Sequence, residues 1–72
     1  MDTQTTLTVT VNGDPHRITS GATIAGMLRE LGVDPVRVAV ERNLAIVPKS
    51  TLENVLVEDD DQFEIVHFVG GG

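Results

Sequence analysis

The chain has 72 residues, with five Lys and Arg against eleven Asp and Glu, two His and no Cys. We expect one domain over residues 1–72, because a chain of this length buries only roughly 60% of its unfolded surface and has no room for a deep catalytic cavity. The net charge of −6 disfavours nucleic acid and anionic membranes as partners and favours a basic protein. The absence of cysteine excludes a disulfide framework, a thiolate zinc site and a cysteine nucleophile.

The leading segment, residues 1–6, is polar and is compatible with disorder. It has neither the basic nor the apolar region of a secretory leader, and no apolar stretch in the chain approaches the roughly 18 residues of a membrane span. We therefore expect a cytoplasmic protein that does not associate with membranes.

The first predicted elements form a β-hairpin. Apolar and polar residues alternate over residues 7–11, as in a half-buried strand. Asn12 and Gly13 tolerate the positive φ angles of a tight turn, so residues 16–19 are expected to return antiparallel. Pro15 lacks an N–H donor, which favours the edge of the sheet for this second strand.

A helix is predicted after the hairpin. Thr23 can cap its first turn and Gly32 can supply a left-handed stop. Gly26, inside the helix, costs about 1 kcal/mol relative to Ala, so we expect it to mark close packing against a strand. The residues that share the apolar face of this helix are Ile24, Met27, Leu28 and Leu31.

Two further strands are predicted after the helix. Asp34 and Pro35 indicate a break, and the third strand then follows from the alternating residues Val36, Val38 and Val40. A short fourth strand is expected over residues 45–47, ended by a proline that cannot donate to a ladder.

The region between the fourth strand and the last one is expected to contain one helical turn. Residues 50–53 (STLE) have the pattern of a capping box, and we expect Leu52, Val55 and Leu56 to face inward. The acidic run over residues 58–61 is expected to be a solvated turn, since it lacks the spacing of a calcium loop.

The last strand is expected over residues 63–69, which completes the order ββαβ(β)β, or ββαββ when the short fourth strand is left out. This order predicts an α+β fold in which one main helix packs on one face of a mixed sheet of four to five strands. Alternation places Phe63 and Ile65 in the core and leaves Val66 and Phe68 on the face that a single helix cannot cover. An exposed apolar pair beside the chain end suggests partner docking, unless loops cover this face or the two residues have no function.

Three glycines, Gly70, Gly71 and Gly72, end the chain. They cannot contribute packing, and a short glycine tail taken alone is more typical of a disordered end. This tail follows an apolar strand directly, however, and its three residues reach only about 10 Å. A partner that receives Gly72 must therefore dock against the domain itself. Without Cβ atoms, Gly70 and Gly71 can pass through a narrow channel and present the Gly72 carboxylate to a partner's active site.

No catalytic residue is predicted within the chain. His16 and His67 lie on different predicted strands with no cysteine to pair with, and no glycine-rich phosphate loop is present. We also expect no metal site and no bound cofactor.

The closing residues 64–72 (EIVHFVGGG), with the ββαββ order, resemble the ubiquitin-like β-grasp sulfur carriers of the MoaD/ThiS family, and most closely the ThiS-type carriers of thiamine biosynthesis. Within the family pattern, Gly71 and Gly72 match the functional diglycine, and Val66 and Phe68 match partner-facing strand positions. Further segments that support the resemblance are residues 11–13, 21–24, 28–32, 38–43 and 46–50.

The resemblance implies a carrier that is not itself an enzyme. An E1-like adenylyltransferase of the ThiF type would use ATP to adenylate Gly72. A sulfur donor, such as a cysteine desulfurase system, would then convert it to a thiocarboxylate, and a thiazole synthase of the ThiG type would consume the sulfur.

Two turns depart from the family pattern. Asn43 and Leu44 stand where members often have Asn-Gly, and residues 59–61 stand where members often have Asp-Gly-Asp. Three alternatives stay open: a carrier for molybdopterin synthesis or tRNA thiolation, a ubiquitin-like modifier whose Gly72 is joined to a lysine, and a passive β-grasp interaction module.

Overall fold

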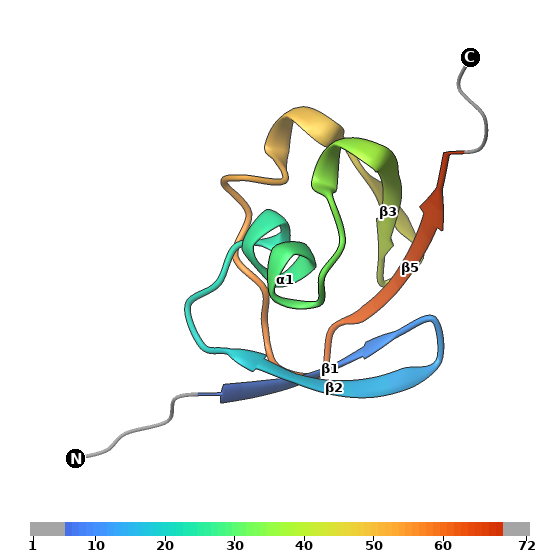
Figure 1. Cartoon of the computed structure of the whole chain (residues 1–72). Helices are drawn as coiled ribbons and strands as arrows, with labels where there is room; N and C mark the ends of the chain where they lie inside the picture. Colours follow the sequence, from blue (N-terminus) through green and yellow to red (C-terminus); the bar gives the residue numbers. More distant parts are fainter. Residues whose placement is uncertain (1–5, 69–72) are drawn as a thin grey trace.

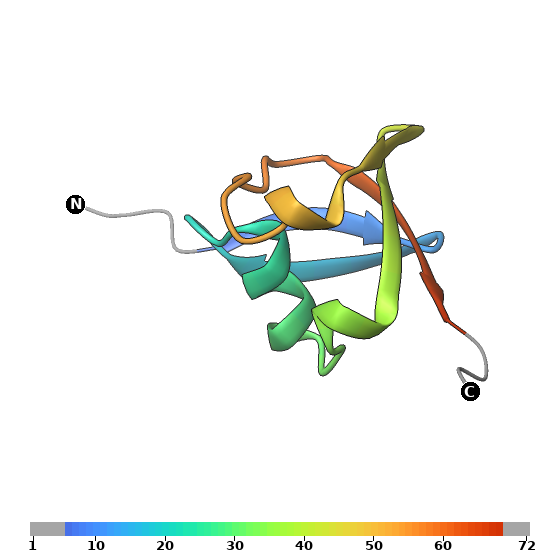
Figure 2. The same cartoon turned by 90° about the horizontal axis from the view of Figure 1, so that it is seen from above.

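The computed structural model describes residues 6–68, which form a five-stranded mixed sheet with one α-helix against one of its faces (Figures 1 and 2). Residues 1–5 of the leading segment and the predicted tail residues Gly70, Gly71 and Gly72 lie outside this part of the chain, whereas Thr6, the last residue of the leading segment, lies in a strand. The elements in chain order are β1 (Thr6–Val11), β2 (Asp14–Thr19), α1 (Ile24–Glu30), the 3₁₀ turn η1 (Pro35–Arg37), β3 (Val38–Arg42), β4 (Ala45–Val47), the 3₁₀ turn η2 (Lys49–Thr51) and β5 (Gln62–His67).

The strand order is β2-β1-β5-β3-β4, in which β1 and β5 are parallel and the other neighbouring pairs are antiparallel. The predicted mixed sheet and its single main helix are confirmed. In both views β1 begins and β5 ends at opposite ends of the molecule. Because β5 is the middle strand of this order, the strand that leads to the chain end runs through the centre of the sheet.

The β1–β2 hairpin has the predicted turn. Asn12 and Gly13 adopt φ angles of 50° and 89°, and β2 lies at the edge of the sheet, as Pro15 predicts. The Asn12 side chain has a second role, because its Nδ2 donates to the carbonyl oxygen of Ile65 (3.1 Å) and its Oδ1 accepts from the Ile65 N–H (2.8 Å). This amide ties the hairpin turn to the middle of β5.

Helix α1 begins where the sequence predicts. Thr23 is the N-cap, and its Oγ1 accepts from the N–H of Gly26 at 3.0 Å. The N–H groups of Ile24 and Ala25 donate to carbonyl oxygens of the segment after η2, at 2.9 and 2.8 Å. Donors at the helix N-terminus, which have no partner inside the helix, are thus satisfied by a segment far along the chain.

The expectation that Gly26 packs closely against a strand is wrong. A Cβ atom at this position would lie 3.3 Å from Thr23 Oγ1 and 3.8 Å from the Ala22 Cβ. Glycine here leaves room for the capping threonine. Gly32, with a φ of 81°, adopts the left-handed conformation predicted for the helix stop.

The core lies between α1 and the inner face of the sheet. Phe63 and Ile65 are buried in it, as the alternation along β5 predicts. Its other buried residues are Val9, Ile18, Ile24, Ala25, Met27, Leu28, Val38, Val40, Leu52 and Val57.

Val36 does not belong to the third strand, contrary to prediction. Pro35 begins η1, and the Asp34 carboxylate accepts from the Val36 N–H at 3.0 Å. This side-chain bond and the fixed φ of proline favour a tight turn over extended backbone. Val36 is therefore exposed, and β3 begins at Val38.

The capping box predicted over residues 50–53 does not form. The 3₁₀ turn η2 begins directly after Pro48, and no side chain caps it. Leu52 is buried as predicted, but Leu56 is 57% exposed. Val57 is buried in its place, because the chain is extended beside Thr23 and only one of two successive side chains can face the core.

The acidic turn of residues 58–61 is not fully solvated, since Asp61 is only 5% exposed. Its Oδ2 accepts from Arg42 Nε (2.9 Å) and from the Glu58 N–H (2.8 Å), and its Oδ1 accepts from Asn43 Nδ2 (3.1 Å). Burial opposes ionisation of this carboxyl, but the hydrogen bonds and the guanidinium outweigh it, so the pKa of Asp61 lies below its ordinary value. Asp61 thus joins the β3–β4 turn to the start of β5.

The two turns that depart from the family pattern keep positive φ angles without glycine. Asn43 and Leu44 have φ angles of 51° and 73°, and Asp60 has a φ of 71°. Left-handed backbone costs a side chain such as leucine roughly 1–2 kcal/mol. Leu44 is exposed and has no packing in the core to offset this cost.

Candidate functional site

The end of β5 is held where the chain leaves the sheet. The N–H of Phe68 donates to the Arg37 carbonyl oxygen at 2.9 Å, which extends the β3–β5 pairing by one residue. The Nζ of Lys49 lies 4.4 Å from the centroid of the Phe68 ring and donates to the Val36 carbonyl oxygen at 2.7 Å. These contacts connect Phe68 to η1 and η2, and they set the point from which the chain continues to the predicted tail.

An apolar surface lies on the outer face of the sheet beside this point. Val66 and Phe68 are exposed, as predicted, and Ile46 of β4 is also exposed. Ala39 of β3 stands directly opposite Val66 in the register of the two strands. We call Ala39, Ile46, Val66 and Phe68 the outer patch.

Two grooves run along the outer patch. One, of about 300 Å³, is lined by Ala39, Ile46 and Val66 together with Glu41 and Glu64. The other, of about 220 Å³, includes Ile46, Lys49 and Phe68 in its lining. The patch is thus grooved, and carboxylates line one of its two grooves.

Two members of this surface, Ile46 and Ala39, could not be assigned to it from the sequence. Alternation cannot assign a face to Ile46, because Ala45 and Val47 on either side are also apolar. The strand register assigns Ile46 to the outer face, because Ile46 pairs with Glu41, which lies on the outer face of β3. The roles of Val66 and Phe68 in docking, and of Gly70, Gly71 and Gly72 beyond them, stay predictions.

The two histidines do not form a pair. His16 lies on β2 and His67 on β5, and β1 separates these strands in the sheet. Within residues 6–68, no three His, Asp or Glu side chains are grouped so that they could hold a metal ion. Over the same residues, no helix has the length and apolar character needed to cross a membrane.

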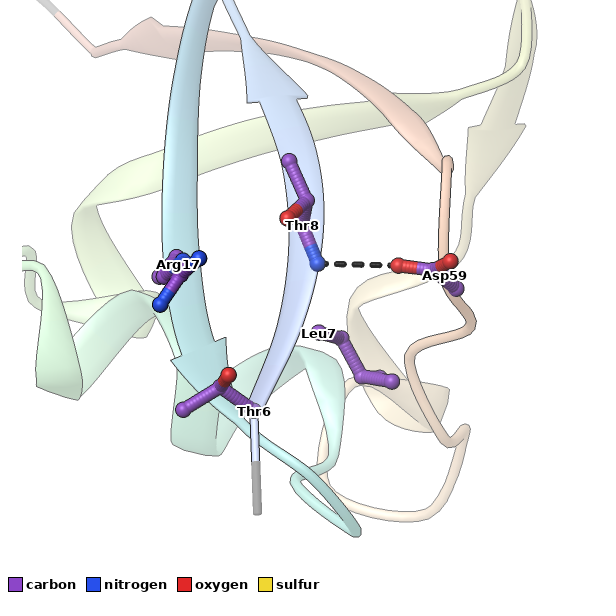
Figure 3. Close-up of a pocket in the computed structure, with 5 residues that line it drawn as sticks. All are labelled: Thr6, Leu7, Thr8, Arg17 and Asp59. Atoms are coloured by element: carbon purple, nitrogen blue, oxygen red, sulfur yellow. Dashed lines mark hydrogen bonds between the residues drawn. The ribbon is translucent and has the colours of Figure 1, made fainter. Parts of the chain in front are cut away.

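An open hollow of about 520 Å³ lies near the start of β1, at the end of the molecule opposite to where β5 ends (Figures 1 and 3). One polar contact at the hollow is the bond from the Thr8 N–H to Asp59 Oδ1 at 2.9 Å, which ties the acidic turn to β1. Arg17 and Asp59 lie on opposite sides of β1 in the close-up. The bond gives Thr8 and Asp59 a structural role, so we do not include the hollow in the candidate site. Its lining residues are Thr6, Leu7, Thr8, Arg17 and Asp59.

Comparison with known sequences gives matches over most of the chain. A thiazole synthase of Magnetococcus marinus is 50% identical over 62 residues, which are 86% of this chain but only 19% of that protein. The sulfur carrier protein ThiS of Bacillus subtilis is 44% identical over 50 residues, which are 69% of this chain and 76% of that protein. The chain therefore spans about a fifth of the length of the synthase and most of the length of the carrier.

Solved structures and a family model agree with these matches. The crystal structure of the thiamine biosynthesis protein ThiS from Geobacter metallireducens superposes with a TM-score of 0.73 at 30% identity, covering 92% of this chain and 100% of that one. The model of the ThiS family matches residues 9–72, a range that includes the outer patch and the three glycines. The chain therefore belongs to the ThiS family and has the ubiquitin-like β-grasp fold.

Proposed function

We propose that this protein is a sulfur carrier of thiamine biosynthesis and that the carboxylate of Gly72 is the group that carries the sulfur. The observation that supports this most directly is the family match, which continues through Gly72. The fold supports it as well, because an exposed apolar patch lies beside the point where the chain leaves the sheet.

The proposed chemistry uses ATP and two displacement steps. A carboxylate oxygen of Gly72 attacks the α-phosphorus of ATP and pyrophosphate leaves, which gives an acyl adenylate. Hydrosulfide, which a thiol reductant releases from the persulfide of a cysteine desulfurase system, then attacks the acyl carbon and AMP leaves. Sulfur has now replaced one carboxylate oxygen, and the resulting thiocarboxylate donates it for thiazole formation.

The short connection between Phe68 and Gly72 requires a partner that contacts the domain. Four residues extend at most about 14 Å. We propose that an E1-like adenylyltransferase of the ThiF type docks on Val66 and Phe68, with Ile46 beside them, while Gly70 and Gly71 pass through a narrow channel to its nucleotide. Exposed apolar patches of this kind are typical of protein interfaces.

The proposed acceptor enzyme is a thiazole synthase of the ThiG type. A protein named thiazole synthase in Magnetococcus marinus contains a stretch that is 50% identical to this chain, which supports this pairing. In this proposal the carrier is a cytoplasmic co-substrate that binds no cofactor and is not itself an enzyme.

Intact-mass spectrometry tests the proposal. We expect incubation with the cognate adenylyltransferase, ATP and a sulfur donor to replace one oxygen of the chain by sulfur. A variant that lacks Gly72 should stay unmodified and keep its Tm. An unchanged wild-type mass would refute the proposal, and conjugates of higher mass would identify a protein modifier instead. Transfer of the sulfur to a molybdopterin precursor or a tRNA, but not to thiazole, would assign another acceptor pathway.

A pair of matched variants tests the docking surface. Phe68 is 59% exposed on the outer patch, and Leu56 is 57% exposed beside the N-terminus of α1. Phe68→Asp should slow adenylation by about tenfold or more, because truncating an aromatic anchor of an interface commonly costs 2 kcal/mol or more. Leu56→Asp makes the same change at an apolar side chain exposed to a similar fraction and should leave the rate unchanged. Equal effects in two folded variants would exclude the outer patch as the docking site.

A further inference from the structure

Two carboxylates face each other across the strands of the outer patch. Glu41 on β3 and Glu64 on β5 are directly opposite in the antiparallel register. Ile46 of β4 pairs with Glu41 on its other side, and the next outward pair along β3 and β5 is Ala39 with Val66. The two acidic side chains are therefore bordered by apolar ones on the same face of the sheet.

Neither carboxylate is neutralised within the described part of the chain. Glu41 and Glu64 make no ion pair and no side-chain hydrogen bond among residues 6–68. Like charges directly opposite each other destabilise a pair of strands. The basic side chains are not available to neutralise them. Three arginines form ion pairs elsewhere: Arg29 with Glu53, Arg37 with Asp34, and Arg42 with Asp61. Lys49 contacts Phe68, and Arg17 lies on β2, which β1 separates from β5.

The groove between these residues suits one kind of side chain. It measures about 300 Å³, its lining includes Ala39, Ile46 and Val66, and both carboxylates border it. A long side chain with an aliphatic stem and a cationic end can place its methylene groups on the apolar lining and its charge between the carboxylates. Arginine fits better than lysine, because its planar fork of five N–H donors can bind two carboxylates at once.

We propose, on the basis of the proposed function, that the adenylyltransferase inserts an arginine side chain into this groove when it docks on the outer patch. The groove is continuous with the patch beside the chain end, and the net charge of −6 complements a basic partner. The arginine removes the repulsion between Glu41 and Glu64. The two carboxylates therefore stabilise the complex, although they destabilise the strand pair of the free carrier.

Conservative variants test the inference through the affinity of the adenylyltransferase for the carrier, measured by calorimetry without ATP. Glu41→Gln and Glu64→Gln should each weaken binding by about tenfold, the effect of losing one hydrogen bond between charged groups. Higher salt should weaken binding of the wild type more than binding of either variant, because it screens the charges that the variants lack. Asp60→Asn is the control: it removes the same charge, keeps a residue that tolerates a positive φ, and lies in the acidic turn before β5.

Glu64→Lys separates recognition from folding. Lysine opposite Glu41 replaces a repulsive pair with an attractive one, so we expect the Tm to rise by about 1–4 °C. The affinity should nevertheless fall by more than in Glu64→Gln, because the new cation repels the incoming arginine. A structural role for Glu64 would instead lower both quantities, and that result would overturn the inference.

The remaining outcomes are also decisive. In one outcome the wild type is bound and thiocarboxylated, and the two glutamine variants bind with the same affinity as Asp60→Asn at low and high salt. This result would overturn the inference that an arginine enters the groove, and it would leave the proposed function intact. A wild-type carrier that is neither bound nor converted would overturn both. A tenfold loss of affinity in the Glu41 and Glu64 variants but not in the control, together with a weaker salt dependence of their binding, would support the inference.

Discussion

The substitution Asp61→Asn tests the contribution of the buried carboxylate that joins the β3–β4 turn to β5. Its two oxygens accept from Arg42 Nε at 2.9 Å, the Glu58 N–H at 2.8 Å and Asn43 Nδ2 at 3.1 Å. In either orientation of the new amide, its NH₂ group meets at least one donor and cannot accept from it. Arg42, whose side chain is 21% exposed, also loses its close counter-charge, because the Glu58 carboxylate lies 4.0 Å away and is largely exposed.

The expected loss of stability in Asp61→Asn is large for so small a domain. Removing one partner of a fully buried ion pair costs roughly 3–5 kcal/mol. Partial exposure of Arg42 reduces this cost, and the unsatisfied donors add to it, so we expect the free energy of unfolding to fall by about 2–4 kcal/mol. A domain of this size then loses about 10 °C or more in Tm.

Urea and thermal unfolding followed by circular dichroism measure this loss. Asp59→Asn is the matched control, because the exposed Asp59 carboxylate makes a single bond to the Thr8 N–H and its replacement should cost less than about 1 kcal/mol. If Asp61→Asn proves as mild as this control, solvent screens the network and our account of the turn is wrong.

The pH dependence supplies a second check on Asp61. Its pKa is lower in the folded protein than its ordinary value of 3.8. The stability that the ionised carboxylate contributes is therefore present above about pH 4 and is lost as the pH falls through the folded-state pKa. The gap in stability between wild type and Asp61→Asn should narrow from about pH 7 to about pH 3, and a constant gap would contradict this.

Two further predictions concern the turns. Leu44→Gly removes the strain of a φ of 73° but adds freedom to the unfolded chain, so the free energy of unfolding should rise by up to about 1 kcal/mol; a decrease in urea titrations would show that Leu44 is not strained. Asn12→Ala deletes both side-chain bonds to the Ile65 backbone, and stability should fall by about 2–3 kcal/mol. Hydrogen exchange at the Ile65 amide should accelerate in this variant, and unchanged protection there would argue against the bridge.

Local elements could be predicted because their signals lie within a few residues. The turn at Asn12, the cap at Thr23, the stop at Gly32 and the alternation along β5 each depend on neighbouring residues, and each is confirmed. The errors at Val36 and Leu56 arose where a local pattern admits two conformations. A competing contact, from the Asp34 side chain in one case and from the extended pairing with Thr23 in the other, decides between them.

The burial of Asp61 could not be predicted, because its cationic partner, Arg42, is 19 residues away in the sequence. A run of acidic residues predicts a solvated turn, and only the fold shows that the Arg42 guanidinium lies against it. The Asn12 bridge to Ile65 spans 53 residues and left no local signal either.

The sequence by itself determined the family, the element order and the exposed alternation of Val66 and Phe68 before three terminal glycines. Only the tertiary structure decided what surrounds them. The register of β3 between β4 and β5 brings Glu41, Ile46 and Glu64 onto one face. Strand pairing joins residues that are distant in the chain, and no single segment carries the information that sets its neighbours.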